Sequence, residues 1–376
     1  MKNKKNNNNI LTKLLGTLII LLLAVIITFL VILSMDSDKL KNAMETVNQK
    51  VQIGYERFQN FIQERNGNPR NVVIDDNLEF PDEEKLTEAQ RYFYYQQLSD
   101  TAKKIYISIE NNIERIENAE DNIPLPPSLN VEAKSMENGK AYIAKEFQNA
   151  WDAFITDKSE YFYIDSSKVC LVTKMTTKGS NTDYEFFIGK GDNDNYFIDE
   201  FSSKDEVEKA LKEIEKVKNE IIKDANGNNY EKMKYIHDWI VDNVKYDSLE
   251  HEHTSNIYGC LVNKSVVCEG YARAFKYLLD ELDIPCVMVS GTAVDEDGKS
   301  ERHAWNYVYL KNAWYAVDTT WDDPIIIGNG KIDDTIKYKY FLRGNKTMSA
   351  DHFTIGQITK DGFDFEYPEL SEDDIK

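Results

Sequence analysis

The residues most suited to chemistry in this sequence are a cysteine, a histidine and an aspartate that occur in that order: Cys268, His303 and Asp318. Acyl transfer by a cysteine needs a thiolate, a neighbouring base and a group that orients the base. These three residue types supply that set if the fold brings them together. The elements that carry them therefore decide whether the sequence predicts an active site.

Cys268 is predicted to stand at the start of a helix. The apolar residues after Gly270 are spaced by three and four positions, and the helix must end before Pro285. At a helix N-terminus the free backbone N–H groups and the helix dipole favour a thiolate, and the same N–H groups can hold a developing oxyanion. A cysteine considered alone is more often a buried structural residue, but the residues that accompany Cys268 favour the catalytic interpretation.

His303 and Asp318 are predicted to lie on the two strands of one hairpin. Residues 303–310 and 313–318 are rich in aromatic and β-branched residues, and Lys311-Asn312 forms a two-residue turn between them. In that register His303 and Asp318 share a face and lie about 7 Å apart along the ladder, whereas a slip of one residue would place them on opposite faces. An aspartate in this position can orient an imidazole and stabilise its protonated form.

The other histidines carry weaker signals. His237 lies inside a predicted helix and is interpreted as structural. His251 and His253 lie in a polar loop and could contact substrate or a metal, but no third metal ligand is apparent. His352 has no evident partner in the sequence. No metal site and no cofactor is predicted.

An apolar segment near the N-terminus predicts a membrane anchor. Residues 14–33 form an uncharged run of 20 residues, which at about 1.5 Å per residue spans the ~30 Å core of a bilayer. Four lysines precede the run and two aspartates follow it closely, so the positive-inside rule predicts a cytoplasmic N-terminus and an extracytoplasmic body. A cleaved signal peptide is the alternative, but the run is too long for one and lacks a small-residue cleavage site.

The chain is predicted to have four regions and an α+β fold. Long helical patterns cover residues 38–64 and 86–120, and short β-rich runs lie at 161–164, 169–174, 184–188 and 196–198. A helix beginning at Ser203 is predicted to have a capping box with Glu206. The regions are residues 1–35, a cytoplasmic stub with the transmembrane anchor; 36–85, a helical stalk or linker; 86–201, an α+β N-terminal region; and 202–376, the catalytic domain.

Composition disfavours several function classes. The formal net charge of −20 repels nucleic acid, so no nucleic-acid partner is predicted. The four cysteines are widely spaced and form no CxxC pair, which disfavours a zinc site and a disulfide scaffold. The sequence leaves open the disulfide state of Cys170, Cys260 and Cys286.

Three segments resemble the motifs of the transglutaminase-like superfamily: Val267 to Ala272 (VCEGYA), His303 to Asn306 (HAWN) and Trp314 to Asp323 (WYAVDTTWDD). The resemblance covers roughly residues 230–323. The wider chain resembles extracytoplasmic bacterial proteins that join an anchor to such a domain, and residues 338–352 are similar to the tail that often follows it. No region matches the calcium sites of the eukaryotic crosslinking members, so no calcium is expected.

The resemblance implies a papain-like α+β core in which a cysteine at a helix start packs on an antiparallel sheet, with Cys268 as nucleophile, His303 as base and Asp318 as its partner. Members of the superfamily include peptidases, amide-forming crosslinkers and deamidases. We expect a thioester mechanism acting on surface proteins or peptidoglycan stem peptides, with hydrolysis favoured. Protein crosslinking and a catalytically silent binding module are the alternatives. The sequence does not identify the substrate, a side-chain oxyanion donor or the oligomeric state.

Overall fold

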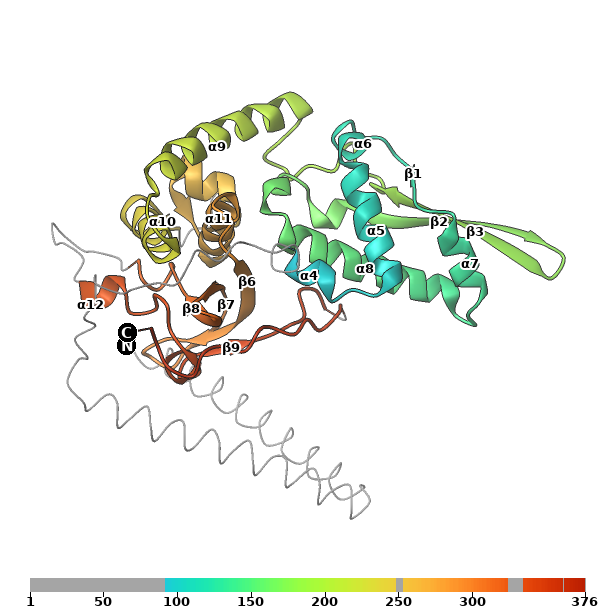
Figure 1. Ribbon diagram of the computed structural model, residues 1–376. Coiled ribbons are helices and arrows are strands. Elements are labelled where there is room, and N and C mark those ends of the chain that lie inside the picture. Colours follow the sequence, from blue (N-terminus) through green and yellow to red (C-terminus); the bar gives the residue numbers. More distant parts are fainter. Residues whose placement is uncertain (1–91, 248–252, 324–333, 361, 376) are drawn as a thin grey trace, which may run out of the picture. The chain divides into compact units, whose positions relative to one another are not determined.

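The computed structural model describes residues 92–247, 253–323, 334–360 and 362–375 (Figure 1). All of them belong to one unit defined by internal contacts, residues 71–376. The predicted stub, anchor and stalk, residues 1–85, lie outside the described residues. Within the described ranges, no helix combines the length and apolar character needed to cross a membrane.

The first described region is a mixture of helices and strands. Its elements are α4 (Phe93–Gln96), α5 (Asp100–Asn111), α6 (Ile113–Glu117), β1 (Ile123–Pro124), α7 (Ser128–Lys134), α8 (Gly139–Asp157), the 3₁₀ turns η1 (Ser159–Tyr161) and η2 (Ser166–Lys168), β2 (Cys170–Lys178) and β3 (Asn181–Gly189). The prediction of one continuous helix up to residue 120 is wrong, because the described part is divided into α4, α5 and α6. The Ser99 side chain accepts a hydrogen bond from the Ala102 N–H and starts a new helix at α5.

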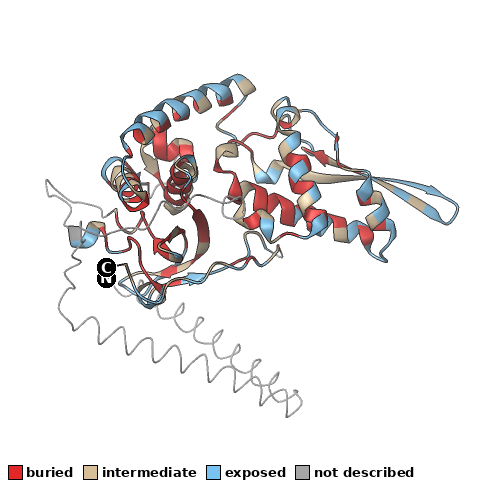
Figure 2. Cartoon of the chain, viewed as in Figure 1, coloured by how far each residue is buried: buried red, intermediate tan, exposed pale blue. Residues whose placement is uncertain are grey.

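β2 and β3 form a long antiparallel hairpin, and β1 pairs with the other edge of β3. Figure 2 shows that the outer half of this hairpin is exposed, in agreement with the burial pattern of β2. The strands predicted at 161–164 and 196–198 are wrong, since these segments form only an isolated bridge between Ile164 and Phe197. Two 3₁₀ turns, η1 and η2, flank Ile164 and leave no room for a strand.

The second region carries the predicted catalytic residues. Its elements are α9 (Lys204–Asp224), α10 (Asn229–Asn243), β4 (Lys245–Tyr246), the π-helical segment η3 (Gly259–Asn263), β5 (Ser265–Val266), α11 (Cys268–Glu281), β6 (Cys286–Val294), β7 (Ser300–Leu310), β8 (Ala313–Val317), α12 (Asp334–Lys337), α13 (Asn345–Met348) and β9 (His352–Thr354). Ser203 caps α9 as predicted. Glu206, however, accepts from the Ser202 N–H instead of closing a capping box. A complete capping box starts α10, between Asn228 and Glu231.

Strands β6 to β9 form one antiparallel sheet with the order β8-β7-β6-β9. Leu310 pairs with Ala313 across the two-residue loop, so the predicted register of the β7–β8 hairpin is confirmed. Lys311 and Asn312 both have positive φ, 52° and 61°, as a tight hairpin turn with a right-handed strand twist requires. The face on which His303 lies is therefore fixed by a turn within its own hairpin.

Two clusters of buried side chains hold the elements together. One cluster places Tyr271, Phe275 and Leu278 of α11 against Val308 of β7 and Val317 of β8. The other cluster includes residues from both regions, from α5 and α8 to β6 and β7. The two regions are also joined by hydrogen bonds, such as the 2.7 Å bond from Arg273 Nη1 on α11 to the carbonyl of residue 155 on α8. The helix that starts with Cys268 is thus packed on the sheet that carries His303.

Candidate active site

Cys268 is the first residue of α11, as predicted, and Val267 precedes it in extended conformation. The Cys268 side chain is half-buried beside Ala272, Met288 and Ala304. Its position leaves the sulfur next to the free N–H groups of the first helical turn. All four cysteines are free thiols in the structure, so none of the cysteines whose pairing the sequence left open forms a disulfide.

The start of α11 offers hydrogen-bond donors to a developing negative charge. The N–H groups of Gly270 and Tyr271 donate to the Val267 carbonyl, at 2.9 and 3.3 Å. Within the described part of the chain, the N–H groups of Cys268 and Glu269 have no acceptor. These two groups lie where an oxyanion formed by attack of Cys268 would need donors.

Gly270 permits the chain to approach the helix start closely. A Cβ atom at this position would lie 2.6 Å from the Thr254 carbonyl oxygen and 2.6 Å from Cβ of Val266. The same carbonyl accepts the Val267 N–H at 2.9 Å. The glycine in the VCEGYA motif is therefore required by packing behind the cysteine.

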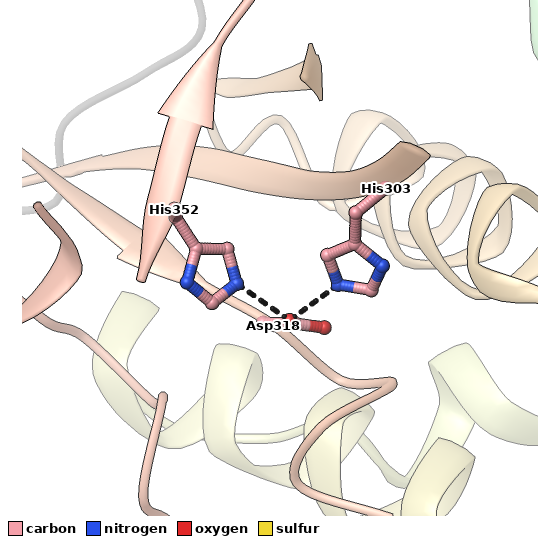
Figure 3. A group of neighbouring side chains, drawn as sticks. All are labelled: His303, Asp318 and His352. Atoms are coloured by element: carbon pink, nitrogen blue, oxygen red, sulfur yellow. Dashed lines mark hydrogen bonds and ion pairs between the residues drawn. The ribbon is translucent and has the colours of Figure 1, made fainter. Parts of the chain in front are cut away.

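His303 and Asp318 are brought together as the hairpin register predicted. His303 lies on β7, Asp318 follows the last residue of β8, and His303 Nε2 is 2.7 Å from Asp318 Oδ2 (Figure 3). His303 is 4% exposed and Asp318 is fully buried. Burial alone raises the pKa of Asp318, but the charge and hydrogen bonds of His303 and the hydrogen bond of His352 hold that pKa well below its usual range.

The ionised carboxylate determines the tautomer of His303. A carboxylate can only accept, so His303 Nε2 carries a proton and donates it to Asp318. In the neutral ring Nδ1 is then unprotonated and can accept a proton. Burial lowers the pKa of His303, but the Asp318 charge and the hydrogen bonds to Asp318 and Cys268 together raise it to about 10. The ring can therefore hold a second proton, on Nδ1, well above the pH at which a free imidazole loses it.

His352 is the residue that sequence reasoning missed. The interpretation that His352 has no partner is wrong. His352 Nε2 lies 3.0 Å from the same Oδ2 atom of Asp318, and His352 Nδ1 lies 2.6 Å from Oδ1 of Asp351. Figure 3 shows both imidazoles pointing at one carboxylate oxygen. His352 reaches this place because β9 pairs with β6, a contact between distant segments for which the local sequence gives no signal.

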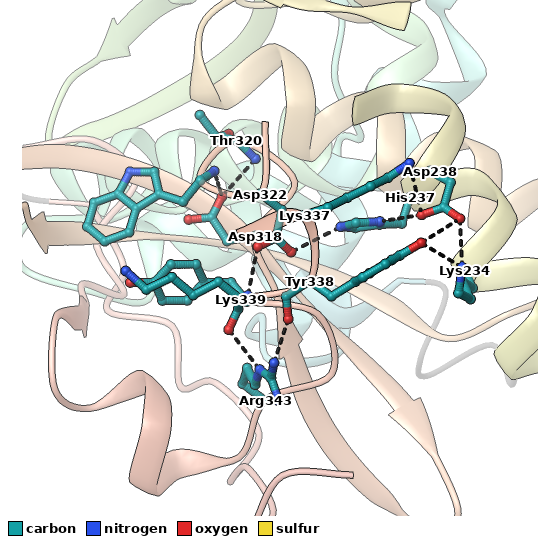
Figure 4. Close-up of polar contacts among 12 residues, drawn as sticks. Lys234, His237, Asp238, Asp318, Thr320, Asp322, Lys337, Tyr338, Lys339 and Arg343 are labelled. Atoms are coloured by element: carbon teal, nitrogen blue, oxygen red, sulfur yellow. Dashed lines mark hydrogen bonds and ion pairs between the residues drawn. The ribbon is translucent and has the colours of Figure 1, made fainter. Parts of the chain in front are cut away.

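A second buried histidine–aspartate pair lies beside the first. His237 Nε2 is 3.0 Å from Asp322 Oδ2, and both side chains are fully buried. Asp322 also accepts the Tyr340 N–H at 2.7 Å, and Asp238 contacts the other nitrogen of His237 (Figure 4). Since Asp322 faces His237 and not His303, the interpretation of His237 as a structural residue agrees with these contacts.

Of the two loop histidines, the structure describes only His253. The ring of His253 packs on Phe201 and Tyr258, with ring centroids 5.0 and 4.8 Å away. His251 lies outside the described residues.

One group of described residues has donor atoms close enough for a metal ion. One nitrogen each of His303 and His352 and one oxygen of Asp318 lie within 4.8 Å of one another. Their nitrogen–oxygen distances of 2.7 and 3.0 Å are those of hydrogen bonds. Ligands of a tetrahedral zinc ion with bonds of about 2.1 Å would stand about 3.4 Å apart. We interpret the group as hydrogen-bonded.

Part of the second region matches a known family model. Residues 215–319 match the model of the transglutaminase-like superfamily. The matched range includes Cys268, His303 and Asp318 and ends before His352.

Two curated relatives align with part of the chain. Kyphoscoliosis peptidase of Mus musculus is 27% identical over 175 residues, which are 42% of this chain and 25% of that protein. Kyphoscoliosis peptidase of Homo sapiens is 29% identical over 142 residues, which are 33% of this chain and 20% of that protein. The chain thus spans at most a quarter of the length of these relatives.

Two solved structures also resemble the chain. One, described as a TGase, has a TM-score of 0.28 and 14% identity, covering 47% of this chain and 50% of its own. The other, a candidate cysteine protease from Cytophaga hutchinsonii, has a TM-score of 0.26 and 15% identity, covering 42% of this chain and 68% of its own.

Proposed function

We propose that this protein is a thiol acyl-transfer enzyme that acts on amide or peptide bonds through a thioester on Cys268, with hydrolysis as its main reaction. The observation that carries the proposal is the buried hydrogen bond between His303 and Asp318, on the sheet against which the helix that starts with Cys268 packs. Interaction with the Cys268 thiol also contributes to the raised pKa of His303. A thiol, a base and a group that fixes the base are what the chemistry requires.

The reaction follows from the tautomer of His303. Nδ1 takes the thiol proton while the sulfur attacks the carbonyl carbon, and a carbon–sulfur bond forms. The oxyanion is held by the N–H groups of Cys268 and Glu269. The carbon–nitrogen bond then breaks, and His303 returns the proton to the leaving amine. Water attacks the thioester, gives a proton to His303, and releases a carboxylic acid and the thiol.

A substrate amine in place of water would give a crosslink instead of hydrolysis. The name of the mouse and human relatives, peptidase, supports hydrolysis. If the protein is an enzyme, the alternative reaction is protein crosslinking by transglutamination. If it is not an enzyme, the alternative function is that of a catalytically silent binding module at the cell surface. All three residue types of the triad are present, and His303 and Asp318 are joined by a hydrogen bond, which favours an enzyme.

We place the catalytic domain outside the cell membrane. The support is the apolar run at residues 14–33 with lysines before it and aspartates after it. Surface proteins and peptidoglycan stem peptides are then the available peptide substrates. No nucleic-acid partner is proposed, since the net charge is −20.

The proposal is tested with the purified domain and its Cys268→Ala variant. Each is incubated with peptidoglycan and with surface-protein fractions, with and without an added primary amine, and the products are analysed by mass spectrometry. New termini that depend on Cys268 indicate hydrolysis, and incorporation of the amine indicates crosslinking. If neither appears, and alkylation does not select Cys268 over Cys170, the enzyme proposal fails and the binding module is favoured.

A further inference from the structure

His352 has contacts that the proposed reaction does not use. Its side chain is 1% exposed, and each of its two nitrogens faces a carboxylate oxygen, Oδ2 of Asp318 and Oδ1 of Asp351. The other oxygen of Asp351 accepts a hydrogen bond of 2.7 Å from the hydroxyl of Tyr340. A buried polar chain therefore runs from His303 through Asp318, His352 and Asp351 to Tyr340.

The carboxylate of Asp318 is saturated by hydrogen bonds. Oδ1 accepts the N–H groups of Thr320 and Trp321, at 2.9 and 3.2 Å. Oδ2 accepts from His303 and His352, at 2.7 and 3.0 Å. The two backbone bonds fix one oxygen, and the two imidazoles together fix the other. Without His352, the oxygen that orients the catalytic base would have one donor instead of two.

The surroundings of His352 favour a protonated ring. Trp305, Trp321 and Tyr340 lie around it, with ring centroids 5.0, 4.7 and 5.2 Å away. Aromatic faces attract cations, and both carboxylates can only accept. Burial lowers the pKa of His352, but the hydrogen bonds to Asp318 and Asp351 raise it above its ordinary value.

We propose that His352 is a positioning residue that holds the Asp318 carboxylate in line with His303, so that the reactive site has four parts instead of three. It touches neither Cys268 nor a reacting atom, and it acts through Asp318. This inference rests on the proposed function, because it concerns the same thiol–imidazole pair.

The test measures the rate at which iodoacetamide alkylates Cys268 at pH 6, with Cys170 as the internal reference. This assay needs no substrate. Glutamine at position 352 can place its amide nitrogen where Nε2 stood and still donate to Asp318. Asparagine can place its nitrogen where Nδ1 stood and reach only Asp351. The two variants lose the same ring and the same charge, so they differ in which carboxylate, that of Asp318 or that of Asp351, keeps its hydrogen bond.

We expect His352→Asn and His352→Ala to slow alkylation about tenfold, the worth of one lost hydrogen bond to a charged group. His352→Gln should stay within about threefold of the wild-type rate. Asp351→Ala changes a side chain that is 22% exposed and therefore lies outside the core. This variant should slow alkylation of Cys268 about threefold. His237→Gln is the matched control, since it alters the other buried histidine and should leave the alkylation rate unchanged.

Several outcomes would overturn the inference. Equal rates for His352→Gln and His352→Asn would show that the bond to Asp318 has no special importance. If the wild type binds one equivalent of zinc tightly and His352→Ala does not, then His303, Asp318 and His352 form a metal site and not a hydrogen-bonded group. If wild-type Cys268 reacts no faster than Cys170, the proposed function itself fails, and this is seen before any variant is made. Circular dichroism of each variant identifies loss of fold.

Discussion

Replacement of Asp318 by asparagine gives a sharp test of the triad, because the structure predicts how the amide will be oriented. Oδ1 accepts two backbone N–H groups, of Thr320 and Trp321. The amide oxygen of asparagine must stay on that side, because a backbone N–H can only donate, whereas a ring nitrogen of His303 or His352 can lose its proton and accept. The NH₂ group then takes the place of Oδ2 and faces Nε2 of His303, which lies 2.7 Å from Oδ2 in the wild type.

His303 must then change tautomer. Its Nε2 has to accept from the amide, so the proton moves to Nδ1, the nitrogen left to receive the thiol proton. In other triads the same exchange reduces turnover by about 10⁴-fold, which is about 5.5 kcal/mol of transition-state stabilisation. The thiol also loses its proton acceptor. An unassisted thiol that titrates near 8.5 is about 0.3% ionised at pH 6, so alkylation at pH 6 should slow by about two orders of magnitude.

Asp322→Asn is the matched control for this experiment. Asp322 is as buried as Asp318, contacts a histidine at 3.0 Å and accepts one backbone N–H, but its histidine is His237. We expect Asp322→Asn to keep the wild-type alkylation rate. Rates are measured by mass spectrometry of the Cys268 peptide after timed exposure to iodoacetamide. A wild-type rate in Asp318→Asn together with a loss in Asp322→Asn would refute the assignment and transfer the third role to Asp322.

Three further predictions follow from the same geometry. Cys268→Ala should abolish turnover with a melting midpoint within about 3 °C of wild type; a larger loss would indicate a structural cysteine. Gly291→Ala should destabilise the fold by about 1–3 kcal/mol in urea denaturation, because its Cβ would lie 2.1 Å from the Phe353 carbonyl oxygen and 2.7 Å from the Trp305 ring; unchanged stability would contradict this packing. The pKa of His303 is raised to about 10 from about 6.5. The stabilisation that protonated His303 gives the folded state is therefore complete below pH 6.5 and disappears as the pH rises to 10. Equal pH dependence of the melting midpoints of wild type and His303→Gln would exclude this linkage.

The parts of the site that the sequence predicted are those defined by short segments. The start of α11 follows from apolar spacing and a proline beyond its end, and the hairpin register follows from a two-residue turn. Cys268 begins the predicted helix, and His303 and Asp318 lie on the two strands that the predicted turn joins. The approach of Cys268 to His303 came from the resemblance, since α11 and β7 are separate elements whose packing no local pattern determines.

The features that the sequence did not predict depend on contacts between distant segments, or on local hydrogen bonds that compete with the expected helix or strand. His352 enters the site through the pairing of β9 with β6, across a segment without a sequence signal. The long helical pattern before residue 120 was divided because Ser99 caps a new helix. The segment around Ile164 has strand-forming residues, but the 3₁₀ turns beside it reduce the strand to one bridge. In each case, side-chain hydrogen bonds or tertiary pairing outweighed intrinsic preference.

The arrangement of the sheet explains why one carboxylate can serve two imidazoles. His303 on β7 and His352 on β9 lie on strands that are separated by β6. His303 pairs with Gly291 of β6, and because this residue has no side chain, the ring of Trp305 can pass above it. The two imidazoles then converge over the central strand, 5.6 Å apart between ring centroids. Asp318 lies at the end of β8, where two backbone N–H groups fix one oxygen and leave the other for both rings. Loss of the glycine would therefore weaken the site through the position of β9, without any change in the triad itself.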